Sequence, residues 1–261
     1  MYPKPIKSLG QNFLIDQNIQ RKIIASCGLD SSDTIIEIGP GRGELTNLLV
    51  DRVKLIYAFE KDSKLATALE NNFRDRTDIK IINKDFLKVD LNKYVKSKNK
   101  IKIIGNIPYY ISTPIIEKIL EQRTKIDSAF ITVQKEFAER VAANPGSKIY
   151  GSLSCLVQYY TAPKILFTIS NSCFRPKPKV ESAFLELKVL PEPSVNVADE
   201  ELFFKIIRTA FNQRRKTLRN SLEGVVSREK LERFFVRNNL NSNIRPEQLS
   251  LKYFGDLTGD C

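Results

Sequence analysis

The feature that most constrains the fold is an alternation of short apolar runs with stretches of helical spacing over the first two thirds of the chain. The apolar, β-branched runs predict strands at residues 34–38, 55–60, 79–83, 101–105, 129–134, 165–169 and 183–189. Helical spacing predicts helices at 44–52, 63–73, 113–121 and 135–143. This alternation predicts an α/β fold with a mostly parallel sheet that helices cover on both faces.

A second domain follows a proline-containing linker. Pro191 and Pro193 interrupt every periodic pattern, and beyond them apolar residues such as Phe203 and Ile207 recur at helical spacing. We therefore expect two domains, residues 1–190 and a small all-helical domain at 195–261.

The amino-acid composition limits the kinds of catalytic group and binding partner that we expect. The chain has no histidine, which excludes histidine general bases and histidine metal ligands, and we expect no metal site. Its 42 Lys and Arg against 30 Asp and Glu give a formal net charge of +12, which favours a polyanionic partner such as nucleic acid.

Targeting signals and cross-links are not evident. The four cysteines are widely spaced, and the first residues lack the apolar stretch of a signal peptide. The longest uncharged stretch, residues 103–116, contains two prolines and is shorter than a membrane span. We expect a reduced, cytoplasmic protein without a membrane anchor, and a monomer.

A glycine-rich turn joins the first predicted strand to the first predicted helix. Its spacing, Gly39-x-Gly41-x-Gly43, lets the backbone turn sharply and approach a ligand. It is neither the dinucleotide fingerprint nor a P-loop, so it disfavours a dinucleotide or triphosphate ligand.

Acidic residues follow the next two predicted strands. Glu60 ends the second strand, where its carboxylate suits ribose hydroxyls. Asp85 follows the third and suits the exocyclic amine of adenine, while Phe86 packs on the ring. In this order the residues describe a pocket for an adenosine-containing ligand without a polyphosphate, which S-adenosylmethionine (SAM) fits.

The fourth predicted strand runs into Asn106, Ile107, Pro108 and Tyr109. The Asn106 side-chain oxygen and the Ile107 carbonyl can accept both N–H groups of an adenine N6 amine and so turn its lone pair toward a methyl group. Pro108 stiffens the turn, and Tyr109 offers a face for an extruded base. The rate enhancement would come mainly from proximity and orientation, without histidine.

Two basic segments are candidates for RNA binding. Arg175, Lys177 and Lys179 alternate with prolines beside Phe174. Between residues 205 and 219 there are six positive residues and no negative one. We expect both segments to contact a phosphate backbone. The candidates in the second are Arg214, Arg215, Lys216 and Arg219.

Taken together, five motifs resemble those of the ribosomal RNA adenine N6,N6-dimethyltransferases, in particular their bacterial small-subunit branch. They are Gln11–Leu14, Glu37–Gly43, Asn106–Tyr109, Phe174–Ala183 and Phe211–Asn220. The resemblance spans residues 11 to 220.

The resemblance implies SAM as methyl donor, a Rossmann-like methyltransferase domain and a helical C-terminal domain that binds rRNA. The substrate would be two adjacent adenosines in a hairpin near the 3′ end of 16S rRNA, within a small-subunit ribosomal particle. The implied site roles concern eight residues: Asn12, Leu14, Gly39 and Gly41 against the cofactor, Glu60 on its ribose, Asp85 on its adenine, Asn106 between cofactor and amine, and Phe174 near the target base.

One position departs from the family pattern, because Tyr110 stands where an asparagine usually follows the motif tyrosine. Three alternative functions remain open at this point. They are a large-subunit rRNA adenine methyltransferase of the macrolide-resistance type, a non-catalytic small-subunit assembly factor, and a DNA adenine methyltransferase.

Overall fold

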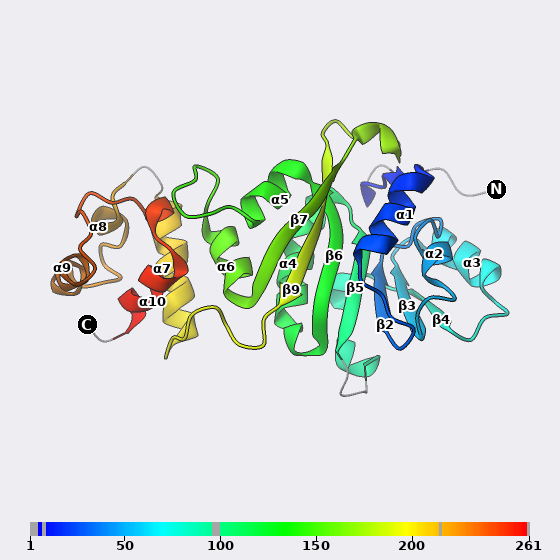
Figure 1. Cartoon of the computed structure of the whole chain (residues 1–261), viewed down its shortest axis with the longest axis horizontal. Helices are drawn as coiled ribbons and strands as arrows, with labels where there is room; N and C mark the ends of the chain where they lie inside the picture. Colours follow the sequence, from blue (N-terminus) through cyan, green and yellow to red (C-terminus); the bar gives the residue numbers. More distant parts are fainter. Residues whose placement is uncertain (1–4, 7–8, 96–99, 214–215, 260–261) are drawn as a thin grey trace. The chain divides into compact units, whose positions relative to one another are not determined.

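The computed structural model describes residues 5–6, 9–95, 100–213 and 216–259 (Figure 1). Contacts between Cα atoms group the chain into two compact units. Unit 1 combines residues 1–138 with 163–189, and unit 2 combines 139–162 with 190–261. No helix in the described part of the chain is long and apolar enough to cross a membrane.

Unit 1 is built on a seven-stranded sheet in the order β4-β3-β2-β5-β6-β9-β7. Strands β2 to β6 run parallel to their neighbours, and β9 is antiparallel to β6. The strands are β2 (Thr34–Ile38), β3 (Leu55–Glu60), β4 (Ile79–Asn83), β5 (Ile101–Asn106), β6 (Ile126–Gln134), β7 (Thr161–Ile169) and β9 (Ser182–Val189). The α/β class and mostly parallel sheet are confirmed.

Helices lie on both faces of this sheet because the chain winds in two directions from its centre. From β2 it moves outward through α2 (Thr46–Leu49) and α3 (Ser63–Asn72), and from β5 it moves the other way through α4 (Ser112–Glu121). Right-handed crossovers then place α4 on the face opposite α2 and α3. Strand-end residues of β2 to β5 therefore meet at one edge, where the order of winding reverses.

Several elements of unit 1 were not expected from the sequence. Helix α1 (Gln17–Ser26) begins after Asp16, whose side chain accepts hydrogen bonds from the Asn18 and Ile19 amides. Strands β1 (Phe13–Leu14) and β8 (Phe174–Arg175) pair antiparallel, with Leu14 opposite Phe174. Helix α2 is shorter than the predicted 44–52, because the backbone turns at Val50 and reaches a positive φ of 66° at Asp51.

The elements of unit 2 are mainly helices, α6 (Ser152–Tyr160), α7 (Glu200–Asn212), α8 (Leu218–Ser221), α9 (Arg228–Arg237) and α10 (Leu251–Thr258). Aromatic rings join α6 to α7: Tyr159 lies 5.0 Å from Phe203, and the Tyr160 hydroxyl donates to Glu200 at 2.7 Å. This packing explains why residues 139–162 group with the C-terminal helices, whereas the sequence suggested one division near residue 190.

Candidate active site

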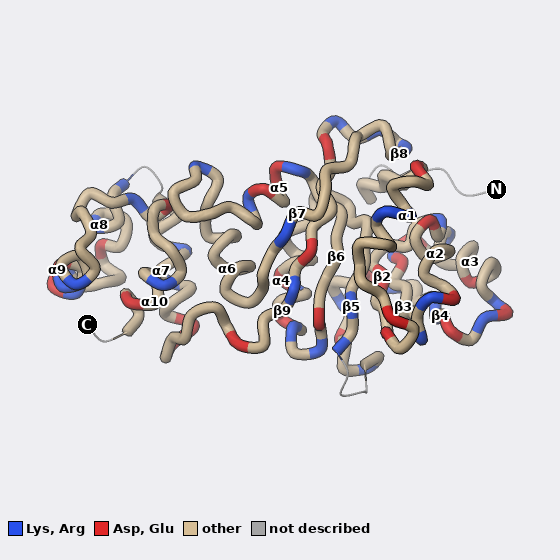
Figure 2. Tube along the Cα trace, viewed as in Figure 1, with Lys and Arg blue, Asp and Glu red and all other residues tan. Residues whose placement is uncertain are grey.

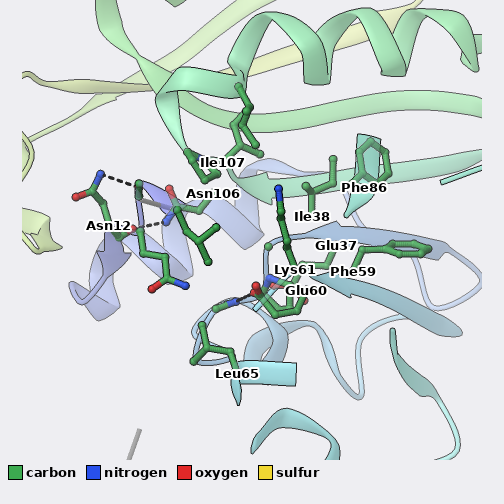
Figure 3. Close-up of a pocket in the computed structure, with 18 of the residues that line it drawn as sticks. Asn12, Glu37, Ile38, Phe59, Glu60, Lys61, Leu65, Phe86, Asn106 and Ile107 are labelled. Atoms are coloured by element: carbon green, nitrogen blue, oxygen red, sulfur yellow. Dashed lines mark hydrogen bonds between the residues drawn. The ribbon is translucent and has the colours of Figure 1, made fainter. Parts of the chain in front are cut away.

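A pocket opens at the carboxyl ends of β2, β3, β4 and β5 (Figure 3). Ten of the predicted catalytic and cofactor-binding residues line it, and they come from five separate stretches of sequence. They are Asn12, Leu14, Gly39, Gly41, Glu60, Asp85, Asn106, Ile107, Pro108 and Tyr109. The fold thus brings these motifs together.

The glycine turn forms one wall of the pocket. Gly39 and Gly41 have positive φ angles of 66° and 63°, which L side chains rarely adopt. A Cβ atom on Gly41 would lie 3.2 Å from the Phe13 ring. Both positions therefore favour glycine for the backbone conformation, and Gly41 favours it also because the N-terminal segment approaches closely.

The Glu60 carboxylate is fixed beside this turn. It is 6% exposed, and it accepts hydrogen bonds from the backbone amides of Gly41 at 3.0 Å and Asp62 at 2.8 Å. Burial raises the pKa of Glu60, and the amide hydrogen bonds oppose that shift. Two hydrogen bonds leave further acceptor positions on the carboxylate, as a ribose diol requires.

The Asp85 carboxylate and the Phe86 ring lie on the next strand end. Phe86 is buried with its edge toward Phe59, at 6.0 Å between ring centroids. Asp85 accepts from the Leu87 amide at 3.1 Å and forms an ion pair with Lys61 at 2.9 Å. Burial raises and Lys61 lowers the pKa of Asp85, and the net shift is downward, so the group is ionised at neutral pH.

The Asn106 side chain is oriented by the N-terminal segment. Its Nδ2 donates to the backbone carbonyl of Asn12 at 2.9 Å (Figure 3). That bond occupies the amide nitrogen and leaves Oδ1 as an acceptor. The neighbouring pairing of β1 with β8 holds the chain just after Asn12 in place.

The Tyr109 side chain is held by a hydrogen bond to a residue on another strand of the sheet. Its hydroxyl lies 2.6 Å from the Ser182 Oγ on β9, and burial raises the pKa of Tyr109. Ile107 is 2% exposed and Pro108 precedes a 3-10 turn, η4 (Tyr109–Ile111). The ring therefore has a fixed position at the wall of the pocket.

Phe174 is the predicted catalytic residue that the structure places apart from this pocket. It is 3% exposed and belongs to the hydrophobic core with Leu14, Ile23 and Phe184. Its side chain packs in this core, and β8 places Phe174 opposite Leu14 of β1.

The predicted RNA-binding residues fall into both units. Arg175, at the end of β8, and Lys177 and Lys179, in the segment that follows it, are exposed, and Figure 2 shows basic residues there. Lys216 is exposed, whereas Arg219 is half-buried and paired with Glu232 at 2.5 Å. Arg214 and Arg215 lie outside the described residues.

Three residues at the site have no individual role that the sequence alone predicts. Glu37 is 1% exposed in the pocket wall and accepts a hydrogen bond from the Thr46 hydroxyl at 2.8 Å. Lys61 pairs with Asp85, and Ser182 holds Tyr109. Each adjoins or belongs to a recognised motif, but side-chain pairing between distant motifs has no local sequence signal.

Comparison with known proteins identifies the family. The family model for ribosomal RNA adenine dimethylase matches residues 4–257. The chain belongs to the ribosomal RNA adenine dimethylase family. Ribosomal RNA small subunit methyltransferase A of Clostridium botulinum (strain Kyoto / Type A2) is 44% identical over 256 residues, 98% of this chain and 93% of its own. The protein of the same name from Alkaliphilus oremlandii is 43% identical over 97% of this chain and 91% of its own.

Two solved structures share the fold. A dimethyladenosine transferase from Plasmodium falciparum has a TM-score of 0.76 and 25% identity, covering 94% of this chain and 95% of its own. The 23S rRNA methyltransferase ErmE has a TM-score of 0.77 and 24% identity, covering 94% and 98%. The Rossmann-like methyltransferase fold and the family's SAM-dependent methyl transfer are thereby confirmed for this chain.

The pocket residues fit SAM. Apolar side chains such as Ile38 and Phe86 suit an adenine ring, and the Glu60 carboxylate, which accepts from two backbone amides and keeps further acceptor positions, suits ribose hydroxyls. The positive-φ glycines let backbone approach the ligand.

Proposed function

We propose that this protein transfers methyl groups from SAM to the N6 amines of two adjacent adenosines in a hairpin near the 3′ end of 16S rRNA, giving dimethyladenosine at each. The proposal is supported by family membership and by relatives named as small-subunit methyltransferases. The observation that carries the chemistry is the Asn106 amide, whose nitrogen is bonded to Asn12 and whose oxygen remains an acceptor in the pocket.

In this assignment Glu60 binds the ribose hydroxyls of SAM, and Asp85 accepts a hydrogen bond from its adenine amine. Gly39 and Gly41 allow the cofactor to lie close to the backbone. Asn12 and Leu14 cover its amino-acid end. SAM supplies an electrophilic methyl group. The residues on the target side then need only to bind and orient the amine.

Asn106 Oδ1 and the Ile107 carbonyl accept the two N–H groups of the target amine. Those contacts direct its lone pair along the remaining direction, toward the cofactor. Tyr109 stacks on the extruded base, as enzymes that act on a nucleobase require. Loss of the correct orientation alone can cost about 100-fold in rate.

We further propose that the substrate is the rRNA within a small-subunit particle, that unit 2 and the 175–179 segment contact the RNA backbone, and that the protein acts as a cytoplasmic monomer. The net charge of +12 supports an RNA partner.

The test is transfer of labelled methyl from SAM to undermethylated small ribosomal subunits, followed by nucleoside analysis. We expect dimethyladenosine from the wild type and at least about 100-fold slower transfer by Asn106→Ala. Transfer only to large-subunit RNA or to DNA would replace the proposed substrate. Full complementation of a deletion strain by Asn106→Ala would instead favour a binding factor that does not need catalysis.

A further inference from the structure

An exposed aromatic side chain stands at the pocket and has no part in the function proposed so far. Tyr110 lines the pocket, yet it is 59% exposed. Among the residues that the structure describes, it is the one aromatic among the exposed large apolar side chains. An exposed aromatic face at a ligand pocket is available to stack on a flat group of a ligand.

The turn that carries Tyr110 separates it from Tyr109. Both belong to η4, and in a 3-10 turn successive side chains point about 120° apart. Tyr109 is directed toward Ser182, to which its hydroxyl bonds. Tyr110 is therefore directed away from that contact, and its ring remains largely in solvent.

The ring of Tyr110 is nevertheless supported on one side. A Cβ atom on Gly10 would lie 2.9 Å from the Tyr110 Cε1, so the ring rests against the backbone of residue 10. Gly10 has a positive φ of 60°, which also favours glycine there. Support on one side and exposure on the other make the ring a pre-positioned platform with little conformational freedom to lose.

Two lysines line the same pocket as this ring. They are Lys84 and Lys61, of which Lys61 pairs with Asp85 at 2.9 Å while its side chain remains 57% exposed. Aromatic rings next to cations are the combination with which proteins bind single-stranded nucleic acid, because every base has a face to stack and every nucleotide carries a phosphate. The exposed ring thus matches the chemistry of a nucleotide rather than of an apolar protein partner.

We propose that Tyr110 stacks on the base of the nucleotide next to the adenosine whose amine lies at Asn106. This inference rests on the function proposed above. Tyr109 and Tyr110 are consecutive and their side chains point about 120° apart, so two consecutive bases can each meet a different ring. The adenosine that is not reacting is then held against Tyr110 while its neighbour is methylated.

The test combines substitutions in the protein with substitutions in the RNA, as a double-mutant cycle does. Small subunits are reconstituted with rRNA in which the neighbouring adenosine is kept, replaced by uridine, or replaced by an abasic site. Single-turnover methyl transfer to the remaining adenosine is measured for wild type, Tyr110→Leu and Tyr110→Phe. Leucine keeps apolar bulk without an aromatic face, and phenylalanine keeps the face without the hydroxyl. Affinity for SAM is measured on each free protein.

For the wild type, we expect removal of the neighbouring base to slow transfer about tenfold, the lower part of the range for base stacking on an aromatic ring. For Tyr110→Leu, removal of the base has less than about a twofold further effect. Tyr110→Phe keeps the wild-type response to the abasic site, and uridine, which stacks less well, gives an intermediate rate.

Equal losses on base removal in wild type and Tyr110→Leu would overturn the inference. So would a loss of SAM affinity in Tyr110→Leu that matches its loss of transfer, because the ring would then only close the cofactor pocket against Gly10. If the wild type transfers no methyl to any of the substrates, the proposed function fails and the inference fails with it.

Discussion

The side-chain oxygen of Asn106 is directed by a residue 94 positions earlier, through a single hydrogen bond to a backbone carbonyl. Because the acceptor is backbone, the side chain of Asn12 does not set this orientation. The catalytic turn depends instead on where the N-terminal segment runs. At the scale of single residues, the chemistry is therefore set by contacts between motifs, and two such contacts give predictions.

Ser182→Ala removes the hydroxyl that holds Tyr109. We expect methyl transfer to fall about fivefold, from the loss of one hydrogen bond of about 1 kcal/mol that positions the ring. Affinity for SAM remains that of the wild type. Single-turnover transfer and calorimetric binding measure the two effects. Ser128→Ala, a buried serine on β6, is the matched control, and an equal loss in the control would count against a specific role of Ser182.

Glu37→Gln changes the pH dependence of stability in the protein without SAM. Burial raises the pKa of Glu37 from 4.5 to about 8, the Thr46 hydrogen bond opposes the shift, and the carboxylates of Glu44 and Glu60 add to it. The folded state thus binds a proton that the unfolded state releases, so this contribution to stability is complete below about pH 4.5 and is lost as pH rises through about 8.

The measurement is the midpoint of thermal unfolding of wild type and Glu37→Gln at about pH 5.5 and about pH 8.5. Glutamine keeps an acceptor for Thr46 and has no proton to lose. We expect the variant to gain stability relative to the wild type at the higher pH. A difference that is the same at both pH values would show that Glu37 does not titrate in this window.

At the scale of secondary-structure elements, the sequence predicts those strands and turns whose own residues follow a local pattern. β2, β3 and β4 coincide with their predicted ranges, because each is an apolar run bounded by charged or turn residues. The glycine turn and the motif at Asn106 were likewise predicted from spacing. Their meeting in one pocket followed from the order of parallel strands.

The elements that the sequence did not predict depend on long-range pairing or mixed patterns. β1 and β8 have two residues each and pair across about 160 positions, so neither has a periodicity of its own. Helix α1 has a local signal, since Asp16 caps it and Ile19, Ile23 and Ile24 follow at helical spacing, but it precedes the first strand and breaks the alternation of strands and helices. The burial of Phe174 follows from the β1–β8 pairing and could not be predicted without it.

Asp62→Ala tests how an element supports the site. The Asp62 carboxylate accepts from the Lys64 amide at 3.0 Å, which caps α3, and from the Gln11 side chain at 3.0 Å. We expect a loss of about 1 kcal/mol in the free energy of unfolding, measured with urea. Asp62→Asn keeps an acceptor for the helix and retains most of the stability; equal stability of all three proteins would mean that the cap is not stabilising.

At the scale of the whole molecule, the net charge of +12 supports the proposed RNA partner. Arg214→Ala combined with Arg215→Ala should weaken binding of small subunits and reduce the slope of log affinity against log salt by about two, leaving SAM affinity unchanged. The same change at Arg52 and Arg74 of unit 1 is the control. A salt slope equal to that of the wild type would remove this pair from the RNA interface.

The aromatic contact between α6 and α7 also bears on how the chain acquires its structure during synthesis. Tyr159 and Tyr160 leave the ribosome about 50 residues before α7, which carries Phe203 and Glu200, is complete. At about 5–20 residues per second this delay lasts several seconds. In that interval a growing chain exposes the face of α6 that α7 later covers. This methyltransferase would therefore expose apolar surface for several seconds of its own translation.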